Sequence, residues 1–192
     1  MKSARLLPSL FFALFLSPAY AAPTPVAFQI IPKESTLRFE AKQGTAVIAG
    51  EFASFSAHIA FHPEALPASK AEVIIDTGSV TASDDEAKDM LPKADWLDVK
   101  AFPQATFSTQ SFTALGGKNY EAHGTLTMKG VTIPVVLVFT LDEFSPEAAS
   151  ITGEAMLKRK DFRIGWDDTA SVADEVKVLV KLKTVAAAAK KP

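Results

Sequence analysis

The chain has 192 residues, of which 48% are hydrophobic and 22% charged, with a formal net charge of −2 and no cysteine. The lack of cysteine excludes thiol catalysis, thiolate metal sites and disulfides. A mildly acidic chain also lacks the basic surface of nucleic-acid binders, so we expect no nucleic-acid partner.

Residues 1–21 have the three parts of a cleavable export signal. Lys2 and Arg5 form a basic start, residues 6–16 are an apolar run, and small residues precede a cut after Ala21. The run is too short for a membrane-spanning helix, which needs about 20 residues. Removing two basic residues from 20, against 22 acidic ones, would leave a charge of −4. We expect residues 22–192 to form one exported domain.

Period-two alternation of apolar and polar residues dominates the remaining chain and predicts strands with one apolar face. The clearest runs, in chain order, are 37–42, 57–62, 72–76, 151–158 and 176–183. Turn signals separate these runs, with few helices between them. The pattern therefore predicts an antiparallel sheet, either closed into a barrel or folded as a sandwich.

Two segments depart from simple alternation. Ser83 followed by three acidic residues predicts a capping box and a short helix that ends at Pro92. Residues 133–141 are apolar on both faces, so we expect a helix or loop to cover one side. Within that run, Pro134 cannot donate a ladder hydrogen bond and predicts a strand start or edge.

Residues that could support catalysis are sparse. His58 and His62 are four apart, but on a strand they would lie about 13 Å from each other, too far for one metal ion. The sequence has no nucleophile elbow, phosphate-binding loop or zinc-protease motif. We therefore expect no enzyme, no metal site and no required cofactor. An enzyme using Asp161 or Asp167 on a lipid is the weakest alternative.

Aromatic residues are the main chemical feature, since eleven Phe remain after the leader, with Trp96 and Trp166. They could fill a packed core, and an eight-stranded barrel is either just filled by its side chains or holds one small ligand. Periodicity does not choose between these cases. The run 158–166 mixes four cations with apolar residues and suits either a lipid head group or a solvated strand end.

A series of motifs in a fixed order resembles the YceI family of polyisoprenoid-binding periplasmic proteins. The matching stretches are Phe28-x-Ile30-x-Pro32, Ser35-x-Leu37-x-Phe39, Gly50-x-Phe52-x-x-Phe55, Ile59-x-Phe61-x-Pro63, Ile75-Asp76-x-x-Ser79-Val80-x-Ala82, Leu91-x-x-x-x-Trp96-Leu97-Asp98-Val99, Phe102-Pro103-x-Ala105-x-Phe107, Gly124-x-Leu126-Thr127-x-Lys129-Gly130, Arg159-x-Asp161-Phe162-x-Ile164-Gly165 and Asp174-Glu175-Val176. The chain departs from the family pattern at two places. It has Arg163 where the family usually has a small residue, and Lys88-Asp89-Met90 where the family usually has an arginine or a histidine.

The resemblance implies an all-β, antiparallel, lipocalin-like barrel of about eight strands with one or two short helices. It also implies a periplasmic protein, monomer or homodimer, that binds, stores or transports a long apolar lipid such as an isoprenoid quinone or polyprenol. A membrane redox protein is a further candidate partner, and a packed interaction or stress-response module is the alternative. From strand alternation we expect the lining to comprise Leu37, Phe39, Phe52, Phe55, Ile59, Phe61, Ile75, Phe107, Leu126, Phe162, Ile164 and Trp166.

Overall fold

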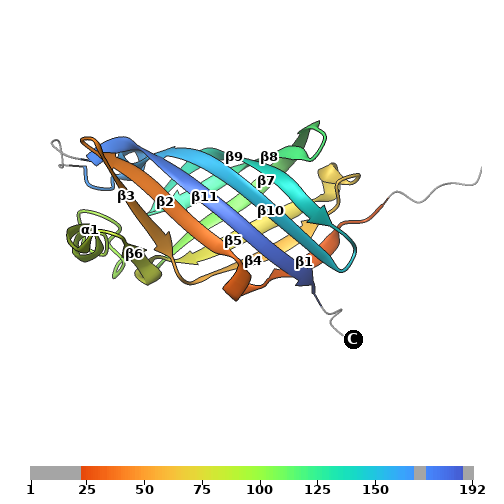
Figure 1. Ribbon diagram of the computed structural model, residues 1–192, viewed down its shortest axis with the longest axis horizontal. Coiled ribbons are helices and arrows are strands. Elements are labelled where there is room, and N and C mark those ends of the chain that lie inside the picture. Colours follow the sequence, from red (N-terminus) through yellow and green to blue (C-terminus); the bar gives the residue numbers. More distant parts are fainter. Residues whose placement is uncertain (1–22, 167–171, 188–192) are drawn as a thin grey trace, which may run out of the picture.

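The computed structural model describes residues 23–166 and 172–187. Within them the chain forms an antiparallel β-barrel with short helices (Figure 1). The elements in chain order are β1 (Val26–Ile30), η1 (Pro32–Glu34), β2 (Thr36–Gln43), β3 (Ala46–Phe52), β4 (Phe55–Phe61), η2 (Leu66–Ala68), β5 (Lys70–Asp76), η3 (Thr77–Ser79), β6 (Val80–Ala82), α1 (Asp85–Met90), β7 (Gln104–Gly116), β8 (Asn119–Met128), β9 (Val131–Phe144), β10 (Ala148–Lys158), η4 (Arg159–Phe162) and β11 (Val172–Ala186). The expected leader, residues 1–21, and Asp167 lie outside the described residues.

The barrel consists of eight walls, where a wall is either one strand or two consecutive strands that run on in the same direction. Three of them consist of two consecutive strands separated by a short break: β1 with β2, β3 with β4, and β5 with β6. The strands β7 to β11 supply one wall each. The first of these breaks begins at Pro32, whose fixed φ suits the start of a 3-10 turn. The expected barrel of about eight strands is therefore confirmed, and the sandwich alternative is not.

The long strand β11 closes the ring. Along one side it pairs with β10 from Lys158↔Glu175 to Ala148↔Val185. Its other side pairs first with β2 and then with β1, where Phe28 lies opposite Ala186. The alternation of residues 176–183 thus places one apolar row on the inner face of a strand that spans the whole barrel.

The helix α1 begins one residue later than the sequence predicts. Asp84, rather than Ser83, is the N-cap, and its Oδ1 accepts a hydrogen bond from Ala87 N–H at 2.8 Å. The Ser83 hydroxyl instead accepts from Ala49 N–H at 3.3 Å, on β3. A tertiary partner therefore displaces the predicted cap, although the helix itself ends before Pro92 as expected.

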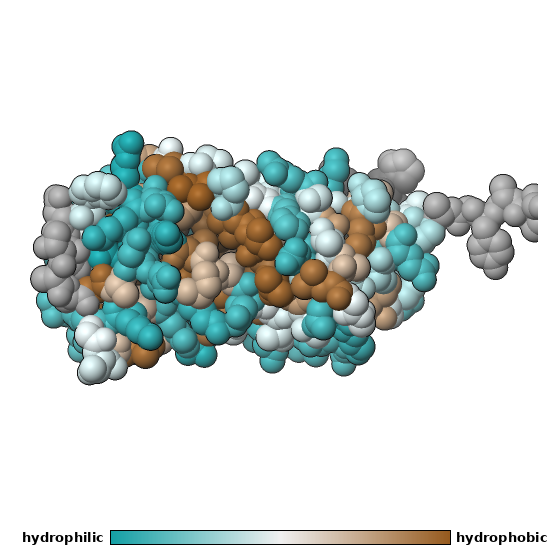
Figure 2. Space-filling model, turned by 90° about the horizontal axis from the view of Figure 1, so that it is seen from above, coloured by the Kyte–Doolittle hydropathy of each residue, from teal (hydrophilic) through white to brown (hydrophobic). Residues whose placement is uncertain are grey.

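No helix or loop among the described residues covers the outer side of strand β9, so the expectation of such a cover over residues 133–141 is wrong. Val136 and Val138 are 41% and 42% exposed. The irregular segment that follows α1 packs over one end of the barrel instead, against Val80 and Leu126. Figure 2 looks down on the barrel and shows a brown hydrophobic band across its surface. Among the described residues, none of the helices has the length and apolar character needed to cross a bilayer.

Candidate functional site

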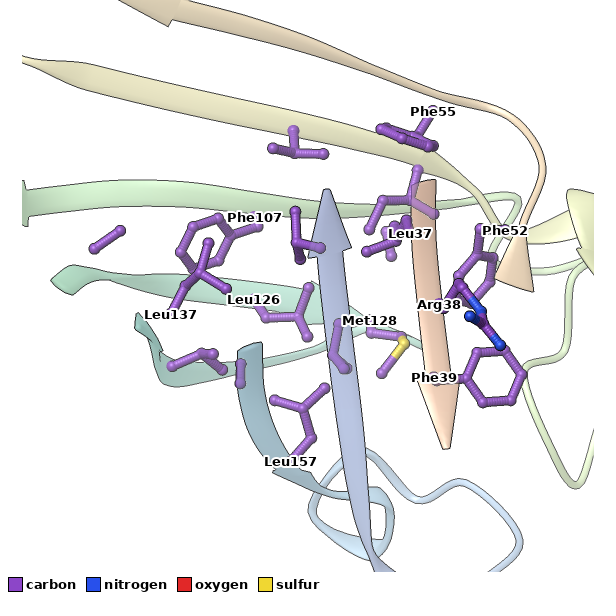
Figure 3. A pocket seen from close by; sticks show the side chains of 18 of the residues that line it. Leu37, Arg38, Phe39, Phe52, Phe55, Phe107, Leu126, Met128, Leu137 and Leu157 are labelled. Carbon is purple, nitrogen blue, oxygen red and sulfur yellow. The ribbon is translucent and has the colours of Figure 1, made fainter. Parts of the chain in front are cut away.

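A cavity of about 260 Å³ lies inside the barrel. All eight walls contribute side chains to it, and almost all of these are apolar. Figure 3 shows Leu37, Phe107, Leu126 and Leu157 projecting from different strands toward the same space. The volume is close to the lower end of the range for small-molecule pockets, about 300–1,000 Å³. The barrel is therefore hollow rather than filled.

Packed aromatic rings close one end of the cavity. Phe61 contacts Phe112, Tyr120 and Phe139 edge-to-face, with ring centroids 5.3, 5.9 and 6.3 Å apart. Tyr120 and Phe139 stack at 5.5 Å on neighbouring strands. Such pairs each contribute about 0.5–1.5 kcal/mol beyond burial, so they stabilise this end of the barrel.

The opposite end is covered by side chains from two irregular segments. Trp96 and Leu97 come from the segment after α1, and Phe162 and Ile164 come from η4 and the turn that follows it. Phe162 is only 1% exposed. Because both segments cross the barrel end rather than continue its ladder, side-chain packing and not a β-ladder covers this end.

Arg159 holds this covering in place. Its guanidinium, 3% exposed as a residue, donates hydrogen bonds to the carbonyls of Ile164 and Gly165 on one side and of Val172 and Ala173 on the other. It also lies 5.4 Å from the ring centre of Trp96. The buried cation is thus bonded to backbone, which is the condition for tolerating it inside a protein.

The other polar residues of the wall are bound to backbone or are exposed to solvent. The Thr184 hydroxyl donates to Ala149 O at 2.9 Å, and the Thr109 hydroxyl donates to Ala71 O at 3.1 Å. Arg38 also belongs to the wall, but it is exposed, and Figure 3 shows it beside Phe39 and Phe52. The cavity therefore offers shape and apolar surface, with little to bind a polar molecule.

Eleven of the twelve residues expected to line the barrel belong to the wall of this cavity. They are Leu37, Phe39, Phe52, Phe55, Ile59, Phe61, Ile75, Phe107, Leu126, Phe162 and Ile164. Their contact with a ligand stays a prediction.

Trp166 was wrongly placed among them. Its side chain is 62% exposed, and it does not belong to the wall. Strand parity fails there because the chain forms η4 after β10 and then turns at Gly165, which has φ +55.

The wall extends well beyond the residues predicted from the sequence. The row Val176, Val178, Val180 and Leu182 lines the cavity and had the clearest alternation in the chain. The alternation of side chains along this strand is therefore sufficient to predict that the row faces the cavity. Strand parity does not assign Phe139 to the cavity, because its strand is apolar on both faces.

The three histidines and Asp161 lie outside the cavity wall. His123 pairs with Glu121 at 2.9 Å, and the Nδ1 of His62 accepts from Glu64 N–H at 3.1 Å. Asp161 is exposed on η4. In residues 23–166 and 172–187 no group of three or more potential ligands could hold a metal ion.

Three lysines outside the cavity have shifted pKa values. Burial lowers the pKa of Lys129, although Asp98 and Asp95 oppose the shift. Hydrogen bonds to Glu154 and Glu34 raise the pKa values of Lys177 and Lys183, respectively. These shifts result from ion pairing and partial burial at the surface, and the three lysines place no acid–base group in the cavity.

Bacterial proteins are similar to this chain in sequence or in fold. The YceI protein of Salmonella arizonae is 33% identical over 141 residues, which cover 71% of this chain and 73% of the relative. The crystal structure of BcnA from Burkholderia cenocepacia matches with a TM-score of 0.75 and 31% identity, over 80% of this chain and 98% of the other. A polyisoprenoid binding domain from Saccharophagus degradans shares the fold, with a TM-score of 0.67 and 15% identity over 84% of this chain and 99% of that domain.

The model of the YceI-like domain matches residues 28–184. This range begins in β1 and ends in β11, so it includes every wall of the barrel. The chain therefore belongs to the YceI-like domain family.

Proposed function

We propose that the protein binds a long apolar lipid inside the barrel, an isoprenoid such as a quinone or a polyprenol, without altering it chemically. The observation that carries the proposal is an apolar cavity inside the barrel whose few polar residues bond to the protein's own backbone or are exposed to solvent. Such a wall stabilises the burial of apolar ligand surface and gives a polar substrate almost no hydrogen-bond partners.

The energetics suit a hydrocarbon chain. Each buried methylene contributes about 0.8 kcal/mol, so a five-carbon isoprene unit contributes several kcal/mol before the cost of ordering the chain. The Saccharophagus degradans structure, described as a polyisoprenoid binding domain, supports the same ligand class by analogy of fold.

The compartment and role form the finer part of the proposal. The export signal predicted for residues 1–21 favours the periplasm, where a long lipid cannot cross the aqueous layer unaided. A carrier or a store would solve that problem, acting as a monomer or homodimer. A membrane redox protein is the partner we would test first if the lipid is a quinone.

The test uses Phe55, which projects from the start of β4 into the cavity. Phe55→Arg places a cation in an apolar wall and should abolish retention of a polyprenol supplied to the lipid-free protein. Leu115→Arg is the control, because Leu115 is 52% exposed and lies outside the wall. Retention by a folded Phe55→Arg variant at the level of the control would contradict the proposal.

A further inference from the structure

The barrel wall has a break between β9 and β10. Their pairing ends at Glu154↔Val138. Beyond that point, β10 continues to Lys158 paired only with β11, and β9 runs back to Val131 paired only with β8, within the described part of the chain. Pro134 lies in this unpaired stretch and has no N–H to offer a neighbouring strand.

Side chains, rather than a hydrogen-bonded strand, fill the break. The 3-10 helix η4 packs against β9, and Phe162 and Ile164 form a buried cluster with Val135 and Leu157 beside it. No backbone hydrogen bond joins η4 to β9 among the residues that the structure describes. A lipid chain passing here would displace side-chain contacts without breaking a β-ladder.

Exposed apolar residues flank the same break on the outside. Val136 and Met156 are 41% and 58% exposed, on β9 and β10, and Trp166 follows η4. Their strand neighbours Val135, Leu137, Ala155 and Leu157 face the cavity. The hydrophobic band in Figure 2 lies on the side of the barrel where β9 and β10 run in Figure 1. Apolar surface is therefore present on both sides of one break.

The charges next to the break favour an anionic surface. Lys158 and Arg163 are exposed at either end of η4, and Lys160 is half-buried between them. Lys129 donates from its Nζ to Arg163 O at 3.0 Å, with Asp95 and Asp98 nearby. Asp161 is the only acidic residue between 158 and 166. Apolar side chains flanked by lysine and arginine are typical of surfaces that lie on anionic bilayers.

We propose that the β9–β10 break is a lateral portal that docks on a bilayer containing anionic phospholipid, and that the lipid chain enters the cavity between these strands. The proposal rests on the lipid-binding function proposed above and adds the route and the docking surface. Its occupant is a bilayer surface, because the exposed residues are continuous with the cavity that the lipid would enter.

The experiment measures uptake of a polyprenol from vesicles of phosphatidylethanolamine and phosphatidylglycerol. Lipid-free protein without the leader is compared with the double variant Val136→Glu/Met156→Glu, whose cross-strand neighbours, His123 and Lys177, tolerate added carboxylates. The matched control is Val185→Glu/Leu115→Glu, which changes residues of 44% and 52% exposure away from the break. Both variants add the same charge at exposed positions.

The portal variant should lose vesicle flotation and take up polyprenol about tenfold more slowly, equivalent to about 1.4 kcal/mol. Its capacity for polyprenol supplied from detergent should equal that of the wild type. Uptake at the wild-type rate, an equal loss in the control, or self-association through this surface without vesicle binding would overturn the portal. If the wild type takes no polyprenol from detergent either, the lipid-binding function itself fails.

Discussion

Filling the cavity with a protein side chain should stabilise the barrel and exclude the lipid. Ala155 lies on β10, is 8% exposed and faces the cavity next to Val178 of β11. The cavity of about 260 Å³ can take the ring of Ala155→Phe, because an engineered cavity of about 150 Å³ already binds benzene. Burying a phenylalanine side chain contributes about 1.5–3 kcal/mol. We expect the free energy of unfolding of the lipid-free protein to rise by about 1–2 kcal/mol.

Urea unfolding measures this change, and retention of a supplied polyprenol should fall in the same variant. The control is Ala87→Phe, since Ala87 is buried in α1 outside the cavity wall and overpacking there should cost about 1–3 kcal/mol without affecting retention. A packed barrel would respond to Ala155→Phe as Ala87→Phe does. A loss of stability with unchanged retention would therefore refute the reasoning.

Three further changes test how the barrel end is held. Arg159→Met removes donors from four carbonyls and should lower the free energy of unfolding by about 3 kcal/mol in urea, whereas no loss would mean that water replaces them. Gly165→Ala should lower the free energy of unfolding by about 2 kcal/mol, because its φ is +55 and its Cβ would lie 2.6 Å from the Arg159 guanidinium. The control Gly44→Ala, at φ +59 in open space, should cost about half as much. Equal losses of stability in the two variants would exclude the clash. Asp84→Ala should cost about 1 kcal/mol by thermal unfolding and Ser83→Ala less, and the reverse order would restore the predicted cap.

Strand parity predicted most of the cavity wall because side chains alternate faces wherever a ladder is regular. Leu37 and Phe39 on β2, and Phe107 on β7, follow that rule. The rule fails at Trp166 because η4 replaces the strand, and no local signal in the run 158–166 marks the change from β to 3-10 geometry. The turn depends on Arg159, whose bonds reach β11, thirteen or more residues further along the chain.

Periodicity could not decide whether the barrel was hollow. The total volume of side chains facing the lumen depends on barrel radius and on how the ends close, and both are set by non-local contacts. The aromatic floor around Phe61 combines residues from β4, β7, β8 and β9. Likewise, a strand that is apolar on both faces, such as β9, predicts that a helix or loop covers one face. The structure instead leaves Val136 and Val138 exposed beside the break.

The most direct test of lipid binding is native mass spectrometry of the purified protein before and after extraction with organic solvent. We expect an apolar adduct in about one-to-one ratio that extraction removes and that added polyprenol restores, with a higher unfolding temperature for the loaded form. A clean mass for the protein alone, together with no uptake of added polyprenol from detergent, would contradict the account.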